Sequence, residues 1–294
     1  MTPAPGGSKA GGGWPVLFRL RVSLLAAVSA ATGSLLVSPR LSLRAIACAA
    51  GVLVLACGAS ALNQYQERDD DALLERTRRR PLPSGSVRAG EALAAAVTLI
   101  GAGLFILGLT GVLLPALGAA AVAWYNGVYT RLKRSSPFAA VPGALTGAVP
   151  PVMGWVSGGG SLGDRGCLAL ALFFFMWQVP HFWLVVLDNG PDYRRSGLPS
   201  LGDVLSEPQI RRIVALWIMG TAVCSLLVVP TVATGIPAAG FLWLAASVWL
   251  AGSACRFFWR TSIPVPSLFR RMNYYLASVF FFLCLGRFLG VLLP

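Results

Sequence analysis

Long apolar stretches, separated by short polar segments, make up most of the chain. Nine of them are long enough to cross a bilayer as helices, and we expect one transmembrane helix in each: about residues 16–38, 42–66, 89–109, 111–132, 138–157, 165–188, 209–231, 236–258 and 268–291. The first is too long and too continuous with the rest for a signal peptide. Pro142, Pro150 and Pro151 interrupt the fifth, a break that membrane helices tolerate where neighbouring helices satisfy the backbone. The pattern predicts an all-α polytopic membrane protein, with one transmembrane domain at 16–294 after a Gly/Pro-rich, disordered segment at 1–15.

Composition agrees with this pattern. Hydrophobic residues make up 56% of the 294 positions and charged residues 12%, and the mean hydropathy is +0.70, which excludes an ordinary soluble domain. If the N-terminus is cytoplasmic, all basic residues except Arg40, Arg44, Arg165 and Arg287 fall on the cytoplasmic side. This bias predicts a cytoplasmic N-terminus and a C-terminus outside. Topology therefore explains the net charge of +13 without a nucleic-acid partner, and the basic rim favours anionic lipid headgroups.

The six cysteines all fall within predicted membrane helices, and none forms a CxxC pair. Cysteine in such a position behaves as a small apolar packing residue. The sequence therefore predicts neither disulfides nor a structural zinc site.

Charged residues concentrate in two long loops on the predicted cytoplasmic side. The first loop, about 67–88, holds five acidic residues and five arginines within residues 67–80. Asn63, Glu67 and Asp71 recur every four residues, so a helix that continues through them places all three on one face. The second loop, about 188–208, has a similar plan: Asp188 and Asp192 are four residues apart and are followed by arginines and a Gly/Pro turn. We interpret the two loops as a weak internal repeat whose acidic helix ends face each other across one cavity.

Three kinds of function fit acidic side chains beside arginines at one membrane face. The acids can pair with the arginines as a solvated surface, couple a cation in a transporter, or hold a divalent metal. Transporters place their ion sites near the midplane at discontinuous helices, which disfavours the second option. Magnesium prefers oxygen ligands and bridges one or two carboxylates to substrate phosphates, while arginines suit an anionic partner. A metal-bound diphosphate satisfies both halves of the cluster, and an apolar bundle can shelter the carbocation left when the diphosphate departs.

Four ordered motifs resemble the UbiA superfamily of intramembrane prenyltransferases, and within it the branch of protoheme IX farnesyltransferases (haem O synthases). The first is Asn63-Gln64-Tyr65-xx-Arg68-Asp69-x-Asp71 with Glu75-Arg76-Thr77-xx-Arg80-Pro81-Leu82. The second is Tyr129-Thr130-x-Leu132-Lys133-Arg134 with Gly147-Ala148-x-Pro150-Pro151-xx-Gly154-Trp155. The third and fourth are Trp177-Gln178-x-Pro180-His181-Phe182-Trp183 and Asp192-Tyr193-Arg194-xx-Gly197-x-Pro199. The resemblance covers about residues 17–205.

The resemblance implies a nine-helix bundle around a central cavity in the bacterial cytoplasmic (inner) membrane. It implies Mg²⁺-dependent transfer of a farnesyl group from farnesyl diphosphate to a vinyl carbon of haem B, with addition of water, to supply haem O to a terminal oxidase. Haem B is then a substrate and Mg²⁺ the cofactor. The implied site comprises metal-diphosphate ligands (Asn63, Glu67, Asp71, Asp188, Asp192), diphosphate-binding side chains (Arg76, Arg80, Lys133, Arg194) and haem-binding side chains (His181, Trp177, Gln178, Arg21).

His181 is the only histidine. A lone histidine on an apolar helix is usually a hydrogen-bonded core residue, whereas neutral imidazole is also a common axial ligand of haem iron. Both interpretations remain open, as does a contact with the haem propionates.

The chain departs from the branch at several positions. Glu67 stands where the superfamily often has aspartate, and Leu20, Ala139, Pro142 and Ser200 differ from the residues expected there. These departures leave the acceptor open to alternatives: a quinone precursor, a chlorin or a lipid headgroup. A non-catalytic haem-delivery scaffold is a further alternative, although it has no need of so many diphosphate-binding residues.

Overall fold

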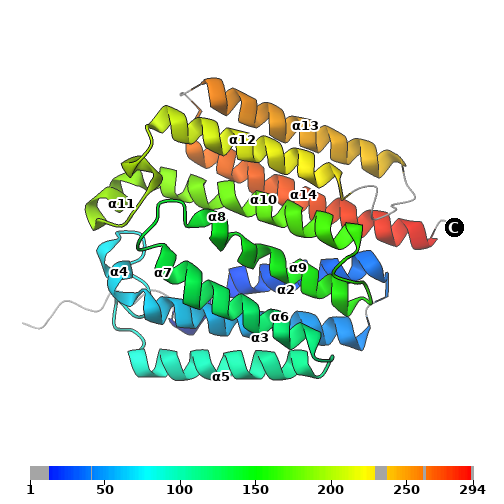
Figure 1. Cartoon of the computed structure of the whole chain (residues 1–294), viewed down its shortest axis with the longest axis horizontal. Helices are drawn as coiled ribbons and strands as arrows, with labels where there is room; N and C mark the ends of the chain where they lie inside the picture. Colours follow the sequence, from blue (N-terminus) through cyan, green and yellow to red (C-terminus); the bar gives the residue numbers. More distant parts are fainter. Residues whose placement is uncertain (1–12, 41, 229–236, 261–262, 293–294) are drawn as a thin grey trace, which may run out of the picture.

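The computed structural model describes residues 13–40, 42–228, 237–260 and 263–292, and all regular secondary structure in these ranges is helical (Figure 1). The predicted all-α class is therefore confirmed. Of the segment 1–15, residues 1–12 lie outside the described part, and Gly13–Leu17 forms a short helix, α1.

Helices occupy the predicted apolar stretches, and the fourth and fifth stretches are divided into shorter elements. The helices are α2 (Leu20–Val37), α3 (Leu43–Gln66), α5 (Ala89–Gly108), α6 (Leu113–Val122) continued by η1 (Ala123–Tyr129) and α7 (Thr130–Leu132), α8 (Ala140–Gly143), α9 (Leu145–Ser157), α10 (Arg165–Asp188), α12 (Glu207–Leu226), α13 (Pro237–Trp259) and α14 (Val265–Leu292). Short elements in the loops are α4 (Arg68–Leu73), α11 (Gly190–Ser196) and the 3₁₀ turn η2 (Leu201–Asp203). Six helices in the described ranges are long and apolar enough to cross a membrane, namely α2, α3, α5, α10, α12 and Gly240–Trp259 of α13. Nine crossings remain a prediction.

Two groups of helices lie side by side in the bundle (Figure 1). One group contains α2, α3, α5, α6 and α9, and the other contains α10, α12, α13 and α14. The groups meet where α10 packs on α9 and α14 packs on α2. The loop helices α4 and α11 are in contact at one end of the bundle, at the left of Figure 1. The two charged loops therefore meet at that end.

Glycines allow the first group of helices to pack closely. A Cβ at Gly154 of α9 would collide with the Ala30 carbonyl of α2, and one at Gly33 would collide with the Pro151 carbonyl. Between α3 and α5, a Cβ at Gly103 would lie 2.7 Å from the Leu55 nitrogen. Small residues at helix interfaces bring backbones together in membrane proteins, where packing replaces the hydrophobic driving force. This packing fixes α3, whose end carries the first acidic motif.

Two predicted helices differ in the structure. The helix through Asn63, Glu67 and Asp71 does not continue unbroken, because α3 ends at Gln66 and Glu67 has φ −99° and ψ 6° before α4 begins. The hydrogen bonds Glu67 N–H to Asn63 O (2.9 Å) and Asp71 N–H to Glu67 O (2.7 Å) nevertheless keep the four-residue spacing. The fifth stretch forms two helices, α8 and α9, that meet at Ala144.

The fourth stretch contains the π-helix η1. There the Thr130 N–H bonds to the Tyr125 carbonyl, five residues back, instead of to the Asn126 carbonyl expected in an α-helix. The Asn126 carbonyl accepts from Gln66 Nε2 at 3.1 Å, and Asn126 Nδ2 donates to the Ala59 carbonyl at 3.1 Å. Polar side chains thus hold the π-helix against the end of α3. Such π segments are rare and frequently occur at functional sites.

Candidate active site

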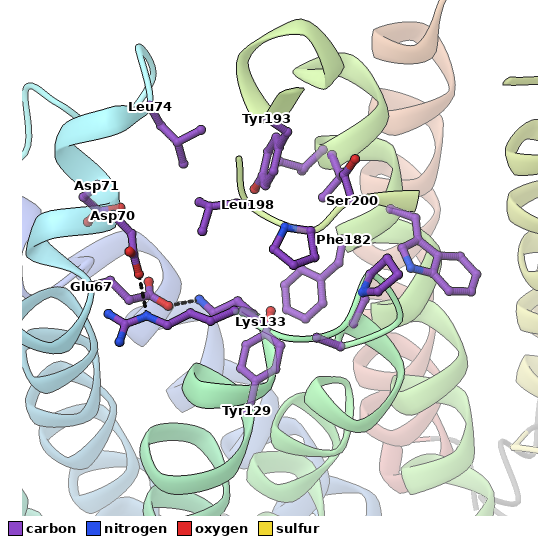
Figure 2. Close-up of a pocket in the computed structure, with 18 of the residues that line it drawn as sticks. Glu67, Asp70, Asp71, Leu74, Tyr129, Lys133, Phe182, Tyr193, Leu198 and Ser200 are labelled. Carbon is purple, nitrogen blue, oxygen red and sulfur yellow. Dashed lines mark hydrogen bonds and ion pairs between the residues drawn. The ribbon is translucent and has the colours of Figure 1, made fainter. Parts of the chain in front are cut away.

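A cavity of about 280 Å³ opens at the end of the bundle where the two charged loops meet (Figure 2). Its walls come from the end of α3 with α4, from the segment after η1, from the last turns of α10 and from the loop after α11. Figure 2 shows Glu67, Asp70 and Asp71 on one side of the cavity and the rings of Phe182 and Tyr193 on the other. The cavity therefore has a charged wall and an aromatic wall.

Glu67 forms an ion pair with Lys133, which comes from the segment after α7. Glu67 is 8% exposed, and the Lys133 ammonium lies 4.9 Å from the centre of the Tyr129 ring. Burial alone would raise the pKa of the Glu67 carboxyl, but the positive charges of Lys133 and Arg19 outweigh it and lower that pKa. Glu67 is therefore a carboxylate at neutral pH.

Asp71 is paired with Arg80. Arg80 Nη1 lies 2.8 Å from Asp71 Oδ1 and 2.7 Å from Oδ2, and the aspartate is 4% exposed. The Thr77 hydroxyl donates to the Asp71 carbonyl at 2.8 Å, which folds the loop back over the end of α4. This turn brings Arg80 to the carboxylate that precedes it by nine residues.

Asn63 lies one helical turn before Glu67 and is fully buried. Its Nδ2 donates to Thr130 Oγ1 at 3.0 Å, while its Oδ1 has no hydrogen-bond partner among the described residues. Glu67 and Asp71 thus line the cavity, whereas Asn63 is buried and does not line it, so the three-residue ligand set remains a prediction.

These three residues fit a divalent metal in one respect and are insufficient in another. The buried, unpartnered Asn63 Oδ1 and the carboxylates of Glu67 and Asp71 are oxygen donors of the type that Mg²⁺ prefers. Within the described ranges, however, no group of three or more His, Cys, Asp or Glu side chains is placed to hold a metal ion. The protein residues therefore need further oxygen ligands, which phosphates and water commonly supply for Mg²⁺.

Asp192 joins the two charged loops. Its carboxylate accepts the backbone N–H of Glu75 at 3.1 Å and that of Arg76 at 3.4 Å, with Arg195 Nη2 at 3.5 Å. The Glu75 N–H is the largest influence on the pKa of Asp192, and together with the Arg76 N–H and Arg195 it lowers that pKa. Asp192 is therefore ionised at neutral pH and holds the first loop to α11.

The two acidic motifs line adjoining hollows instead of one shared cavity. Asp188 and Asp192 line a second, open hollow of about 340 Å³, whereas Glu67 and Asp71 line the first. Arg76 lines both hollows. Asp188 is exposed, so the structure does not bring it to Glu67 and Asp71 as the sequence pattern predicts.

Three of the four predicted diphosphate-binding residues, Arg76, Arg80 and Lys133, line the main cavity. Arg194 is exposed and lines neither hollow, whereas its neighbour Arg195 lines the second. Arg19, which the motifs do not single out, also lines the main cavity and donates from Nη1 to the Tyr125 hydroxyl at 3.2 Å. Its position at the cytoplasmic start of the first predicted helix is a signal that would have placed it at the same membrane face.

Of the predicted haem-binding residues, only His181 lines the cavity. Its ring lies between those of Trp177 and Phe269, with centroid distances of 4.5 and 4.8 Å, and its buried Nδ1 has no hydrogen-bond partner among the described residues. Trp177 packs behind it and donates from Nε1 to the Met272 carbonyl at 3.2 Å. Gln178 packs against Gly147 of α9, outside the cavity lining.

Arg21 is exposed and does not line the cavity either. Other aromatic residues, outside the predicted haem-binding set, complete this wall. Tyr129 stacks on Phe182 with a centroid distance of 6.0 Å, and Trp183 lines the cavity with a buried Nε1 that lacks a partner in the described part of the chain. Tyr129 precedes Lys133 by four residues, a helical spacing from which a shared face could have been predicted.

Comparison with known proteins identifies similar sequences that cover most of this chain. The sequence profile of the "UbiA prenyltransferase family" matches residues 21–286. A protoheme IX farnesyltransferase of Geobacter sulfurreducens is 44% identical over 247 residues, which cover 82% of this chain and 88% of that protein. One from Oleidesulfovibrio alaskensis is 37% identical over 257 residues, covering 85% and 91%.

Solved structures share the fold at low sequence identity. A structure of digeranylgeranylglyceryl phosphate synthase has a TM-score of 0.78 at 14% identity, covering 93% of this chain and 97% of the other. An apo UbiA homologue from Aeropyrum pernix has a TM-score of 0.71 at 20% identity, covering 93% and 99%. A UbiA homologue from Archaeoglobus fulgidus, bound to GPP and Mg²⁺, has a TM-score of 0.62 at 14% identity, covering 92% and 99%.

Proposed function

The chain belongs to the UbiA prenyltransferase family, and from this premise we propose that it transfers a farnesyl group from farnesyl diphosphate to a vinyl group of haem B, producing haem O. The observation that carries the proposal is the match to protoheme IX farnesyltransferases across most of both chains. A cavity with one charged and one aromatic wall supports it, because the two substrates have a charged end and a planar apolar ring respectively.

The reaction exchanges one carbon–oxygen bond for a carbon–carbon bond and adds water. The allylic C–O bond of farnesyl diphosphate breaks, and the diphosphate leaves with both bonding electrons. The terminal vinyl carbon of haem B bonds to the farnesyl carbon, and the neighbouring vinyl carbon takes hydroxide from water while a proton is released. The protein must therefore neutralise the departing diphosphate and keep other water from the farnesyl cation.

Basic side chains at the charged wall perform the first task. Arg19, Arg76, Arg80 and Lys133 line the cavity and provide four positive charges for the diphosphate. Lys133 and Arg80 are held in place by Glu67 and Asp71, so their positions are set before the substrate binds. Such pre-organised charge is usually the largest single contribution to stabilising a developing anion.

We propose that Asn63, Glu67 and Asp71 also hold Mg²⁺. When bound, the metal supplies positive charge beside the diphosphate oxygens. The magnesium and GPP bound to the Archaeoglobus fulgidus homologue support divalent metal use in this family. Asp188 and Asp192 line the adjoining hollow, which shares Arg76 with the main cavity, and their contribution to the same metal-diphosphate remains a prediction.

The aromatic wall is suited to a porphyrin. Phe182, Tyr129 and Trp183 present ring faces and edges, and His181 offers an unpartnered ring nitrogen next to the same cavity. We propose that His181 contacts haem B either at the iron or at a propionate, and that Trp177 supports its ring from behind. The predicted contacts of Gln178, Arg21 and Arg194 with substrate remain predictions.

The proposal places the site at the cytoplasmic face of a bacterial inner membrane, with the N-terminus inside and the C-terminus outside. The distribution of basic residues supports this orientation. The product would then be available to a terminal oxidase that uses haem O.

A purified full chain in lipid nanodiscs tests the function directly. With haem B, farnesyl diphosphate and Mg²⁺, we expect a product whose mass is that of haem B plus one farnesyl group and one hydroxyl. Parallel reactions offer a quinone precursor and a chlorin as acceptors. Prenylation of one of these, with no haem O, would show that the departures at Leu20, Ala139, Pro142 and Ser200 accompany a different acceptor.

A further inference from the structure

Arg19 has an unusual backbone conformation. Among the described residues it is the only one besides glycines with a positive φ, at φ 43° and ψ 48°. It stands at the break between α1 and α2, and it lines the cavity. A left-handed conformation costs energy for a residue with a Cβ atom and persists only where the surrounding structure holds it. The contacts that hold Arg19 therefore bear on the site.

Gln64 of α3 supplies contacts of this kind. The residue is 1% exposed, and its Nε2 donates to the Val16 carbonyl at 2.8 Å and to the Leu17 carbonyl at 2.7 Å. An amide NH₂ group has two protons, so each carbonyl can receive one of them. The opposite orientation of the amide would set Oε1 against two carbonyl oxygens, so these acceptors determine which end of the amide faces α1.

The two carbonyls lie directly before Arg19 in the chain. The Arg19 N–H bonds to the same Val16 carbonyl at 3.1 Å. On its other side, the Arg19 carbonyl accepts the N–H groups of Val22 and Ser23 at 2.8 and 3.0 Å. Gln64 thus fixes the backbone that leads into Arg19, and the first turn of α2 fixes the backbone that leaves it.

We propose that Gln64 is a positioning residue, which ties the end of α1 to α3, keeps Arg19 in its left-handed conformation and so sets the Arg19 charge at the cavity for the diphosphate. The inference rests on the proposed function, because it needs a diphosphate at the charged wall. The helix α3 then positions two charges at that wall. One is Glu67 at its own end, and the other is Arg19, held through Gln64.

Gln64→Met removes the donor and keeps a side chain of similar length. Leu17 packs in an apolar cluster with Ala61 of α3, so α1 should stay on α3 and the variant should fold. The backbone before Arg19 is then free to relax, and the guanidinium group can leave the cavity. Hydrogen bonds to charged groups typically contribute about tenfold or more to affinity, so we expect Arg19→Ala to weaken pyrophosphate binding about tenfold and Gln64→Met about fivefold.

The test is a calorimetric titration of the full chain in nanodiscs with Mg²⁺ and inorganic pyrophosphate, without haem. Arg80→Ala is measured first, because it reports on the proposed diphosphate site itself. If Arg80→Ala binds pyrophosphate as tightly as the wild type, that site and the inference built on it are both wrong. If Arg80→Ala weakens binding while Gln64→Met does not, the site stands and the positioning role of Gln64 is refuted.

Combination with Arg19→Ala separates positioning from simple structural support. Once the Arg19 charge is absent, adding Gln64→Met should weaken pyrophosphate binding no further. If Gln64→Met weakens binding by the same factor with and without Arg19, it acts through the fold or through another residue, and the inference is overturned. Gln64→Leu gives the same comparison if the methionine variant does not fold.

Discussion

Arg80 Nη1 donates to both carboxylate oxygens of Asp71, at 2.8 and 2.7 Å, although the two residues are separated by a turn of irregular loop. The Arg80 and Asp71 side chains, taken without the backbone, are 18% and 6% exposed, so this pair is far less screened than a surface ion pair. A cation held in this way is already at the cavity before a diphosphate arrives. The fold of the first loop therefore determines where the positive charge of Arg80 lies for the departing diphosphate.

Arg80→Ala should lower the rate of farnesyl transfer by about 100-fold, because removal of one pre-organised donor to a developing anion typically costs this much. The rate of haem O formation under saturating substrates measures the change. Arg79→Ala is the matched control, since Arg79 is exposed and does not line the cavity, and its rate should equal that of the wild type. Equal losses in the two variants would show that general loop charge matters, and not the Asp71–Arg80 pair.

His181→Ala should weaken binding of haem B and leave binding of pyrophosphate unchanged. His181 lines the aromatic side of the cavity, away from the Asp71–Arg80 pair. An optical titration with haem B and a calorimetric titration with Mg²⁺ and pyrophosphate measure the two sites separately. Binding of haem B to the wild type should shift the Soret band. In His181→Ala we expect this shift to be smaller. Equal loss of both ligands would mean that the histidine only supports the fold between Trp177 and Phe269.

Asp192→Ala should release the first loop from α11. The Glu75 and Arg76 amides lose their acceptor, so their hydrogen exchange should become faster, and the affinity for farnesyl diphosphate should fall because Arg76 is no longer held at the cavity. Asp192→Asn keeps one acceptor oxygen and should preserve part of the protection. Asp69→Ala is the control, because Asp69 is exposed and forms an ion pair with Arg68 at 3.7 Å, away from Asp192. Unchanged exchange at Glu75 and Arg76 in Asp192→Ala would refute this link.

The Glu67–Lys133 pair should stabilise the folded chain at neutral pH and lose this effect as the pH falls. The pKa of Glu67 is lowered below its ordinary value of 4.5, because Lys133 and Arg19 outweigh the effect of burial. The ionised carboxylate therefore stabilises the folded chain above about pH 4.5, and this contribution is lost as the pH falls through the lower folded-state value. At pH 7 the melting temperature of Glu67→Gln should be lower than that of the wild type, by about 2–4 °C for each kcal/mol lost.

The difference between Glu67→Gln and the wild type should shrink as the pH falls below 4.5. Glu75→Gln provides a comparison, since Glu75 pairs with Arg78 on the exposed surface, where ion pairs contribute little. Its melting temperature should follow the wild type at every pH. If the difference in melting temperature between Glu67→Gln and the wild type stays the same at low pH, the carboxylate charge is not the cause of that difference.

The fold could be predicted from sequence where a local pattern decides it. Apolar length alone placed the long helices, since a stretch such as 165–188 has no other stable state in a bilayer. The structure also keeps the predicted helical spacing of Asn63, Glu67 and Asp71, because the backbone hydrogen bonds between them continue past the end of α3. Local patterns thus gave both the helix positions and the first acidic cluster.

Features that depend on tertiary contacts could not be predicted in the same way. The break at Glu67, the π-helix and Arg19 at the cavity all lie at contacts with side chains from distant segments. The spacing of Asp188 and Asp192 resembled that of the first motif, but it did not show that Asp192 binds the loop backbone or that Asp188 is exposed. Spacing places residues along one helix, whereas a shared cavity requires the packing of several.

The most direct test of the account measures haem O by mass spectrometry after incubation of the full chain with haem B, farnesyl diphosphate and Mg²⁺. We predict that the wild type and Arg79→Ala form haem O, that Asp71→Asn forms at least about 100-fold less, and that EDTA stops the reaction until Mg²⁺ is restored. Haem O formed at the wild-type rate by Asp71→Asn, or in the presence of EDTA, would contradict the claim that this buried carboxylate serves a metal-bound diphosphate.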